Sequence, residues 1–268
     1  MNYSLADAGG LSLSVLSYIP IVVAPGFALA AAGAWWTPKT PAQPPASLMA
    51  ILAAFAALPI LDSLTVRCLG LTPALLLNLV LAAAGLALAV GAGWRPRLSP
   101  IAAAALATWF LLVLIEWIDF DVGHRLYQPL LIVDLVKHAA TTQAIHDTGA
   151  PPIDPFFLRP ERASYYYFFY TLSALSEQLC GGLADARAAV GGLVFWTGVS
   201  LYALLRVVIS RAALVASPWN ARVGVILLVV LMLGGLDILP VIRMGLVQGA
   251  WLPDPATWNE QVLSLIHI

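Results

Sequence analysis

The chain has 268 residues, of which 61% are hydrophobic and only 10% are charged, and its net charge is -1. An ordinary soluble domain carries roughly 25% charged residues, so this chain lacks the polar side chains that a water-exposed surface needs. No Lys/Arg cluster is present, which argues against nucleic acid as a partner because phosphate binding requires many grouped cations. The composition therefore indicates an integral membrane protein whose expected partner is membrane lipid.

Long apolar runs predict the membrane spans. About 20 apolar residues cross a hydrocarbon core of about 30 Å, and in that environment only a helix satisfies every backbone N–H and C=O of such a run. The runs predict an all-α fold, a polytopic transmembrane helical bundle of about seven spans. In chain order these spans lie at 11–35, 47–66, 73–93, 100–117, 165–183, 188–209 and 223–239.

The spans divide the chain into N-terminal transmembrane helices at 1–115, a long polar loop at 116–164, and further transmembrane helices at 165–268. The end of the chain stops without a helix boundary, which predicts a fragment truncated at its C-terminus. Four basic residues fall on one side of this threading: Lys39, Arg95, Arg97 and Arg187. The positive-inside rule makes that side cytoplasmic. We therefore predict a multi-pass protein of the cytoplasmic membrane with an extracytoplasmic loop.

Two groups of residues complicate this threading. Three arginines, Arg206, Arg211 and Arg222, would lie at the outer face, against the rule. Three polar residues also fall within or at the ends of spans: Asp62, Asn78 and Asp237. An ionised group that faces lipid costs ~2.5 kcal/mol or more, so Asp62 and Asn78 could line a bundle interior or a water-filled path. A snorkelling or capping role is the favoured interpretation for Asp62 and Asp237, which lie near span ends.

The loop at 116–164 concentrates ionisable residues, with 7 of the 14 Asp and Glu and 3 of the 4 His of the chain. Within it, four polar residues recur at every fourth position and so share one helix face: Asp134, His138, Thr142 and His146. Gly149 and the prolines after it give a stop signal. The pattern predicts a short helix in the membrane interface, apolar side down and polar stripe up. The stripe is either a solvated face or a functional surface.

A proline-rich segment follows, "PPIDPFFLRPER", and then a run of tyrosines, "YYYFFY". The prolines favour a stiff extended coil, in which Asp154 either presents its carboxylate or forms an Asx-type turn. Tyr165, Tyr166 and Tyr167 suit an aromatic belt. Because consecutive residues of a helix point in different directions, at least one of the three should also face the bundle and find a hydroxyl partner.

The order of these elements resembles a known family. Asp134, His138, "PPIDPFF", "YYYFFY" and "GGLADARAAVGGLVFW" are similar, over about residues 116–209, to the YYY-domain membrane proteins and more broadly to GT-C class glycosyltransferases. The resemblance implies that a sugar is taken from a polyprenyl-phosphate carrier with an essential acid of the first outward-facing loop. Asp134 matches that acid best by position, and Asp119 and Asp121 compete with it. Several spans precede this loop, whereas many GT-C proteins have one.

Sugar transfer would explain the residue types of the loop. Asp134, Asp121 or Asp119 could act as the general base that takes a proton from the acceptor hydroxyl. A leaving phosphate needs cations or hydrogen-bond donors. The predicted substrate-binding residues are Lys137, His138, Asp154, Arg159, Arg162, Tyr165, Tyr166 and Tyr167.

The sequence leaves three points open. His138 could instead form an i,i+4 pair with Asp134 that stiffens the helix. Mg²⁺ or Mn²⁺ could bridge Asp119, Asp121 or Asp154, since hard cations prefer oxygen ligands. The alternative function is a transporter or flippase-like protein whose path would be lined by Asp62, Asn78 and Asp237. A non-catalytic scaffold would leave the acidic loop unexplained.

Overall fold

The computed structural model describes residues 4–34, 46–94, 100–117, 120–122, 125–127, 132–156, 160–162, 167–211 and 221–232. The chain forms two units, Met1–Val207 and Val208–Ile268. The first unit contains all the elements from α1 through most of α8. In the second, the described residues are the last turn of α8 and helix α9 (Ala221–Met232).

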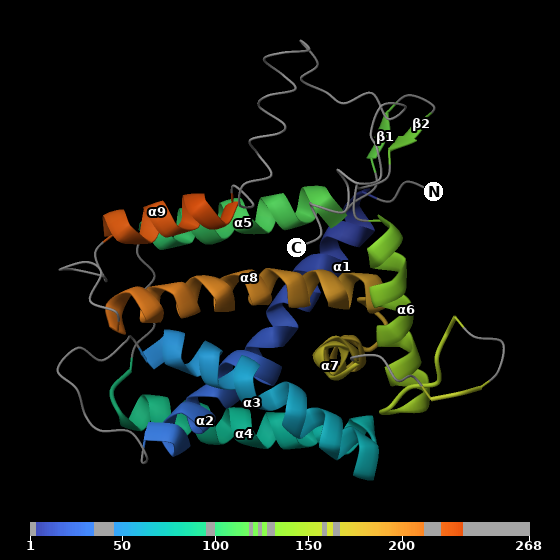
Figure 1. Ribbon diagram of the computed structural model, residues 1–268, viewed down its shortest axis with the longest axis horizontal. Helices are drawn as coiled ribbons and strands as arrows, with labels where there is room; N and C mark the ends of the chain where they lie inside the picture. The colour runs from blue at the N-terminus through green and yellow to red at the C-terminus, as the bar shows by residue number, and fades with distance from the viewer. Residues whose placement is uncertain are drawn as a thin grey trace. The chain divides into compact units, whose positions relative to one another are not determined.

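Four long apolar helical segments dominate the first unit (Figure 1). One is the segment Asp7–Gly33, which combines α1 (Ser4–Tyr18), the π-helical turn η1 (Ile19–Val23) and α2 (Ala24–Ala34). The others are α3 (Ala46–Leu69), α4 (Leu71–Gly91) and α8 (Ala186–Arg211). Each is long and apolar enough to cross a membrane, so the prediction of a membrane-embedded helical protein is confirmed. Seven spans are not.

Shorter elements complete the first unit. They are α5 (Pro100–Trp117), β1 (Phe120–Val122), β2 (Arg125–Tyr127), α6 (Ile132–Thr148), the 3-10 turn η2 (Phe168–Tyr170) and α7 (Thr171–Cys180). The two strands pair antiparallel, with Asp121 opposite Leu126. The all-α prediction did not foresee this small hairpin, which lies in the long loop. The other named elements of the unit are helical, and an isolated β-bridge joins Ile153 to Arg162.

The predicted span at 165–183 is where the structure departs most from the sequence analysis. Its helical part is η2 followed by the ten residues of α7. At about 2.0 Å per residue in η2 and 1.5 Å in α7 this gives a length of about 21 Å, which is shorter than the apolar core of about 30 Å. Gly181 and Gly182 end the helix with φ of 60° and 83°, a conformation that glycine adopts at little cost. Helix α8 therefore begins on the same side as the loop.

Two indole contacts show the direction of α8. The Trp117 side chain donates from Nε1 to the carbonyl oxygen of Arg187 at 2.7 Å, and Trp109 donates likewise to Phe195 at 2.9 Å. The later tryptophan of α5, Trp117, contacts the earlier residue of α8, Arg187. The two helices are therefore antiparallel. Arg187 thus lies beside the end of α5 that leads into the loop. The predicted grouping of Arg187 with Arg95 and Arg97 does not fit this contact, because in the sequence those two arginines precede the opposite end of α5.

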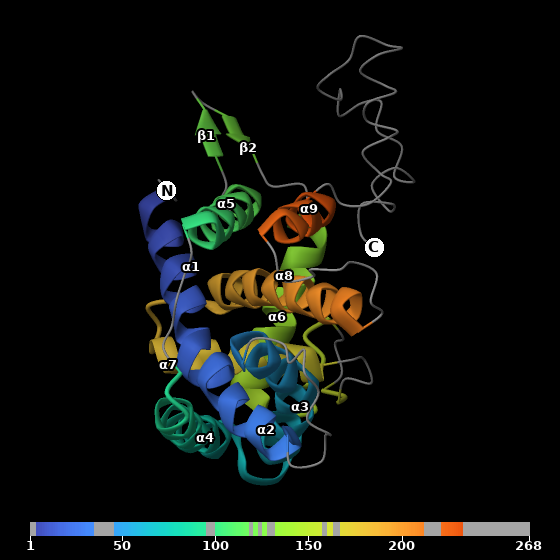
Figure 2. The ribbon, with the colours of Figure 1, turned by 90° about the vertical axis from the view of Figure 1, so that its left-hand side faces the viewer.

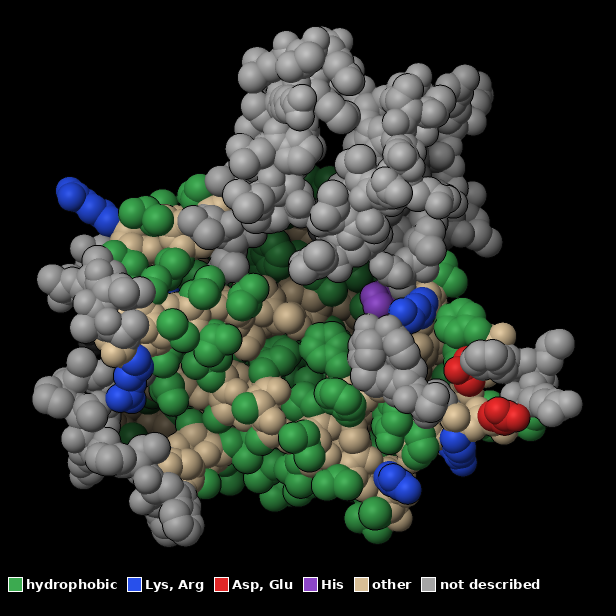
Figure 3. Space-filling view, in the orientation of Figure 1, with side chains coloured by type: hydrophobic (Ala, Val, Ile, Leu, Met, Phe, Trp, Pro, Cys, Tyr) green, Lys and Arg blue, Asp and Glu red, His purple; other side chains and the backbone are tan. Residues whose placement is uncertain are grey.

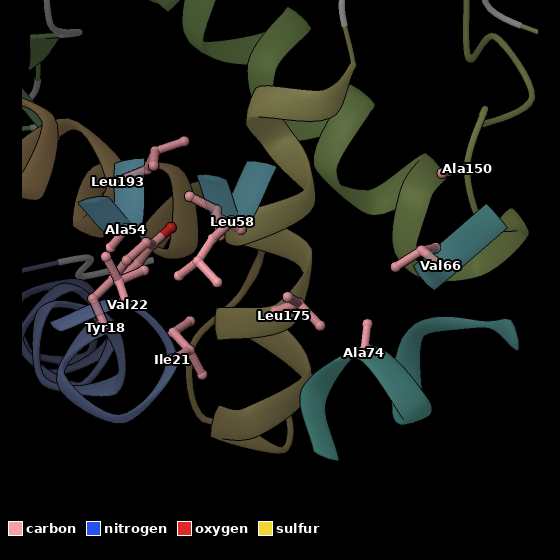
Figure 4. Close-up of a cluster of buried hydrophobic side chains, with 11 residues drawn as sticks. Tyr18, Ile21, Val22, Ala54, Leu58, Val66, Ala74, Ala150, Leu175 and Leu193 are labelled. Carbon is pink, nitrogen blue, oxygen red and sulfur yellow. The ribbon is translucent and has the colours of Figure 1, made fainter. Parts of the chain in front are cut away.

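Small residues let the long helices approach one another closely. A Cβ on Gly26 would overlap the carbonyl oxygen of Ala50 in α3, and a Cβ on Gly85 of α4 would overlap that of Ala24 in α2. Buried side chains from η1, α3, α7 and α8 form one cluster that includes Ile21, Leu58 and Leu175 (Figure 4). Hydrophobic side chains also cover much of the outer face formed by these helices (Figure 3).

Helix α6 runs across the ends of the long helices rather than along them (Figures 1 and 2). Its first turn packs through Leu135 in a cluster that includes Trp117 and Val190, and its last turn packs through Ile145 against Tyr170. A helix thus occurs where the sequence predicted one, and it ends at Gly149 with a φ of 79°. We call α6, η2 and α7 the loop-side layer.

Candidate functional site

The sequence pattern placed the polar stripe of α6 on the side away from the membrane. In the structure, much of the stripe instead packs against neighbouring elements. His138 is half-buried, and its Nδ1 shares a hydrogen bond of 2.5 Å with the hydroxyl of Tyr170, while the two rings stack with centroids 5.2 Å apart. One turn further on, Thr142 is fully buried, and its hydroxyl has no partner among the described residues. Only His146 of these three is exposed. The stripe is thus largely an interface with η2 and α7.

Asp154 makes a turn in the segment after α6. Its Oδ1 accepts a hydrogen bond of 2.9 Å from the backbone N–H of Phe156, which is the Asx-type turn that the sequence offered as an alternative. The backbone N–H of Asp154 donates to Glu161 at 2.9 Å, closing a narrow arm. One carboxylate oxygen of Asp154 is therefore engaged in shaping the arm.

Arg162 attaches this arm to α6. Its Nη1 donates to the carbonyl oxygens of Pro151 at 2.6 Å and Thr148 at 3.1 Å, and its backbone pairs with Ile153 in an isolated β-bridge. Arg162 was predicted to bind a phosphate. In the structure these hydrogen bonds hold the arm against the end of α6.

A cavity of about 200 Å³ opens at the loop side, where the start of α1, the end of α5 and the turn before α8 meet. Its lining includes Asp7, Trp117, Leu183, Asp185 and Arg187. The Arg187 guanidinium donates from Nη2 to the carbonyl oxygen of Trp117 at 2.6 Å, and the Trp117 indole donates in return to Arg187. This reciprocal pair fixes a cation at the wall of the cavity.

Two described residues that neighbour the candidate acids in the sequence, Trp117 and Leu135, relate differently to this cavity. Trp117 lines it and directly precedes the segment with Asp119 and Asp121. Leu135, which follows Asp134, is buried in the same cluster as Trp117. Asp119 and the side chains of Asp121 and Asp134 lie outside the part of the chain that is described, so their mutual geometry stays a prediction.

Of the other predicted binding residues, some are described by the structure and some are not. Lys137 and Tyr167 are half-buried, and Tyr167 packs against the cluster around Tyr170. Arg159, Tyr165 and Tyr166 lie outside the described residues. Within the described ranges, no three His, Cys, Asp or Glu side chains lie close enough to hold a metal ion, and the metal prediction for Asp119 and Asp121 falls beyond them.

Sequence reasoning missed three residues of this region. Tyr170 is the last tyrosine of "YYYFFY", and four-residue spacing from Tyr166 could have marked it as inward-facing. Arg187 was grouped with arginines that precede the opposite end of α5. Glu177 of α7 is buried, and burial raises the pKa of its carboxyl, while nearby His146 acts in the opposite direction. A glutamate inside a predicted span is a signal that was available.

Asp62 and Asn78 form a separate polar contact between α3 and α4. Both side chains are fully buried, and the amide of Asn78 donates from Nδ2 to Asp62 Oδ2 at 3.0 Å. The snorkelling or capping role predicted for Asp62 is therefore wrong, because the carboxyl points into the bundle. Asp237, the third polar residue of the predicted path, lies outside the described residues.

The resemblance to the GT-C class covers about residues 116–209 and depends on the order of short motifs. The structure describes parts of those motifs and does not by itself identify a family. No family model matches the chain, and neither a curated protein nor a solved structure matches it significantly.

Proposed function

We propose that this protein is a membrane glycosyltransferase of the GT-C type, which transfers a sugar from a polyprenyl-phosphate carrier to an extracytoplasmic acceptor at the loop-side cavity. One observation supports this above the others. The cavity wall contains a fixed arginine beside Trp117, which precedes Asp119 and Asp121 in the sequence, and Leu135, which follows Asp134, is buried in the same cluster as Trp117. A cation beside carboxylates is the combination that phosphate-linked sugar transfer needs.

The proposed topology has the four long helices and α5 crossing the cytoplasmic membrane, with α6 in the outer interface and α7 entering from that side. Because α8 is antiparallel to α5, Arg206 lies level with the start of α5. The connection that leads into α5 contains Arg95 and Arg97. The sequence analysis had placed Arg206 at the outer face, where arginine is disfavoured. With α8 antiparallel to α5, Arg206 instead lies on the same side as Arg95 and Arg97, which supports a cytoplasmic assignment for that side.

In the proposed reaction the acceptor oxygen attacks the anomeric carbon, and the bond from that carbon to the phosphate oxygen breaks. A carboxylate among Asp134, Asp121 and Asp119 takes the acceptor proton. The electron pair leaves with the polyprenyl phosphate, whose negative charge Arg187 stabilises. The sequence analysis predicted that other cationic residues bind the phosphate. Arg187 is the better candidate because it lines the cavity.

The lipid part of the carrier also suits this position. Leu183 lines the cavity and is 77% exposed, which leaves an apolar side chain at the rim where a prenyl chain would pass. A polyprenyl donor can therefore remain in the membrane while its phosphate reaches Arg187.

The decisive experiment is a transfer assay with polyprenyl-phosphate sugars and the purified protein. We expect Arg187→Gln and at least one of Asp134→Asn, Asp121→Asn and Asp119→Asn to abolish transfer in folded protein. Arg211→Gln is the matched control, since it makes the same change at the other end of the same helix. Full transfer by the Arg187 variant and all three Asp variants would refute the proposal, as would donor-independent flux of substrate across the membrane without transfer.

A further inference from the structure

The pair Asp62 and Asn78 is a second polar site, which lies within the long helices and apart from the cavity. Asp62 is about 10 Å along α3 from its loop-side end, as seven residues at 1.5 Å per residue imply. Asn78 Nδ2 donates to Asp62 Oδ2. Among the described residues, Asp62 Oδ1 and Asn78 Oδ1 have no hydrogen-bond partner. One oxygen of each side chain is therefore left without a hydrogen-bond donor.

An ionised carboxylate at this place would lack compensation. Burying a charge without a partner costs far more than one hydrogen bond from a neutral amide returns, so such groups bind a cation or a proton. The helices that pack most closely on α3 are α2 and α4, and neither contains a titratable side chain. The other elements against α3 are η1, which has none, and η2 and α7, which have Tyr170, Glu177 and Cys180. On α3 itself, Arg67 and Cys68 are exposed.

We propose that Asp62 is a proton-binding site within the membrane, with Asn78 as its partner. A proton on Asp62 Oδ1 turns one of these two acceptors into a donor, and Asn78 Oδ1 is the acceptor of the pair that lacks a partner. Carboxyl and amide then exchange two hydrogen bonds, and no buried charge remains. A hard metal cation fits less well, because it requires about six oxygen ligands and this pair offers two.

The proton site adjoins the contact that anchors α7. Ser63, the next residue of α3, shares a hydrogen bond of 3.0 Å with Thr171, and Thr171 directly follows Tyr170, the partner of His138. A charge on Asp62 would draw water or separate α3 from α4 at this level. The protonation state of Asp62 therefore acts on the same packing that positions the loop-side layer.

The first test is labelling with dicyclohexylcarbodiimide near neutral pH, using the folded protein in membranes. This apolar reagent reacts with un-ionised carboxyls, whose O–H adds across its C=N bond, and mass spectrometry locates the adduct. We expect label on Asp62, loss of that label in Asp62→Asn, and retention of it in Asp147→Asn, which removes an exposed carboxylate. An unlabelled Asp62 in folded protein would overturn the proposal, as would protection of Asp62 by added sodium or lithium ions.

The second test uses unfolding temperatures to decide whether Asp62 is protonated or charged. Asparagine at position 62 would reproduce the protonated carboxyl, since its amide donates where the O–H does, and we expect Asp62→Asn to unfold at the wild-type temperature. Asp62→Leu leaves both groups of Asn78 without a partner and should unfold at a lower temperature. If Asp62→Asn is destabilised as much as Asp62→Leu, Asp62 is charged and the proposal fails. Neither test involves sugar transfer, so its result is independent of the proposed function.

Discussion

The long helices and the loop-side layer are held together by different contacts. Between the long helices, backbones approach at Gly26 and Gly85, where even a methyl group would overlap a carbonyl oxygen. In the loop-side layer, Tyr170 and His138 share a hydrogen bond, and Gln178 donates one to Thr72 of α4. Lipid tails are as apolar as leucine, so helices within a membrane associate through close packing rather than through a hydrophobic driving force.

This difference has a practical consequence for mutation. Among the long helices, an increase in volume at a close contact should do the most damage, whereas in the loop-side layer the loss of a hydrogen-bonding group should. The long helices also share some polar contacts. Tyr18 of α1 donates to the carbonyl oxygen of Ala189 in α8, Trp196 of α8 donates to that of Val15 in α1, and Asn78 of α4 donates to the carboxyl group of Asp62 in α3.

The largest effect is expected from Gly85→Ala in α4. The added methyl group meets backbone atoms of Ala24, which cannot rotate away, so we expect a loss of about 3 kcal/mol, at the upper end of overpacking effects. Gly91→Ala in the same helix is the matched control, because nothing lies within 4 Å of its Cβ position. That change should be neutral or slightly stabilising, since alanine favours helix more than glycine does. Equal unfolding free energies of the two variants in detergent would contradict close packing of α2 on α4.

A smaller effect is expected from Tyr170→Phe in the loop-side layer. The change keeps the ring and removes the hydroxyl that bonds His138, at a cost of about 1 kcal/mol. Hydrogen exchange should then be faster in α6 while the long helices keep their protection. Tyr167→Phe makes the same change three residues earlier and should leave α6 unaffected. Unchanged exchange in α6 of the Tyr170 variant would mean that the hydrogen bond does not hold the layer.

The long helices could be predicted from the sequence because apolar length alone decides whether a helix can cross a membrane. Helix α6 could also be predicted, from its four-residue spacing and from Gly149. The failure at α7 has a physical cause. Its run looked like a span, but its hydroxyl side chains bond to other helices, as the hydrogen bond of 2.6 Å between Ser176 and Ser17 shows. Hydropathy does not reveal such pairings between distant residues.

The positions of Arg187 and Asp62 could not be predicted for a related reason. Sides of the membrane are assigned from the sequence by counting spans. If a short helix such as α7 is counted as a span, the side assigned to every later residue is reversed. Arg187 was affected in this way. For Asp62, distance from a span end favoured snorkelling, and the amide that meets it lies 16 residues away in another helix. Of the candidate site, the sequence therefore identified the residue types and their order but not the side of the membrane or the partners.

Glu177 offers a test of the loop-side layer through pH. Burial raises the pKa of its carboxyl, so the folded state keeps the proton at pH values where the unfolded chain has lost it. The resulting stabilisation is complete below the unfolded pKa of about 4.3 and is lost as pH rises through the folded pKa. Glu177→Gln, which stays neutral, should remove this decline and unfold at a higher temperature than wild type at about pH 8.

The control for that pH series is Glu161→Gln, which makes the same change at an exposed acid outside α7. We expect its stability to follow the wild-type curve. If Glu177→Gln falls with pH as steeply as wild type does, the carboxyl is ionised in the folded protein and α7 is more open to water than its burial indicates.

The smallest effect is expected from Arg162→Gln. The guanidinium is exposed, and its two hydrogen bonds to backbone carbonyls hold the arm at 151–162 onto the end of α6. Exposed charged contacts contribute about 1 kcal/mol or less, so global unfolding should not change, whereas proteolysis within the arm should become faster. Arg67→Gln, at an exposed site in α3, is the control for loss of charge. Because the proposed phosphate ligand is Arg187, the Arg162 variant should retain sugar transfer. Loss of transfer with an intact arm would instead return the phosphate to Arg162, as the sequence alone had suggested.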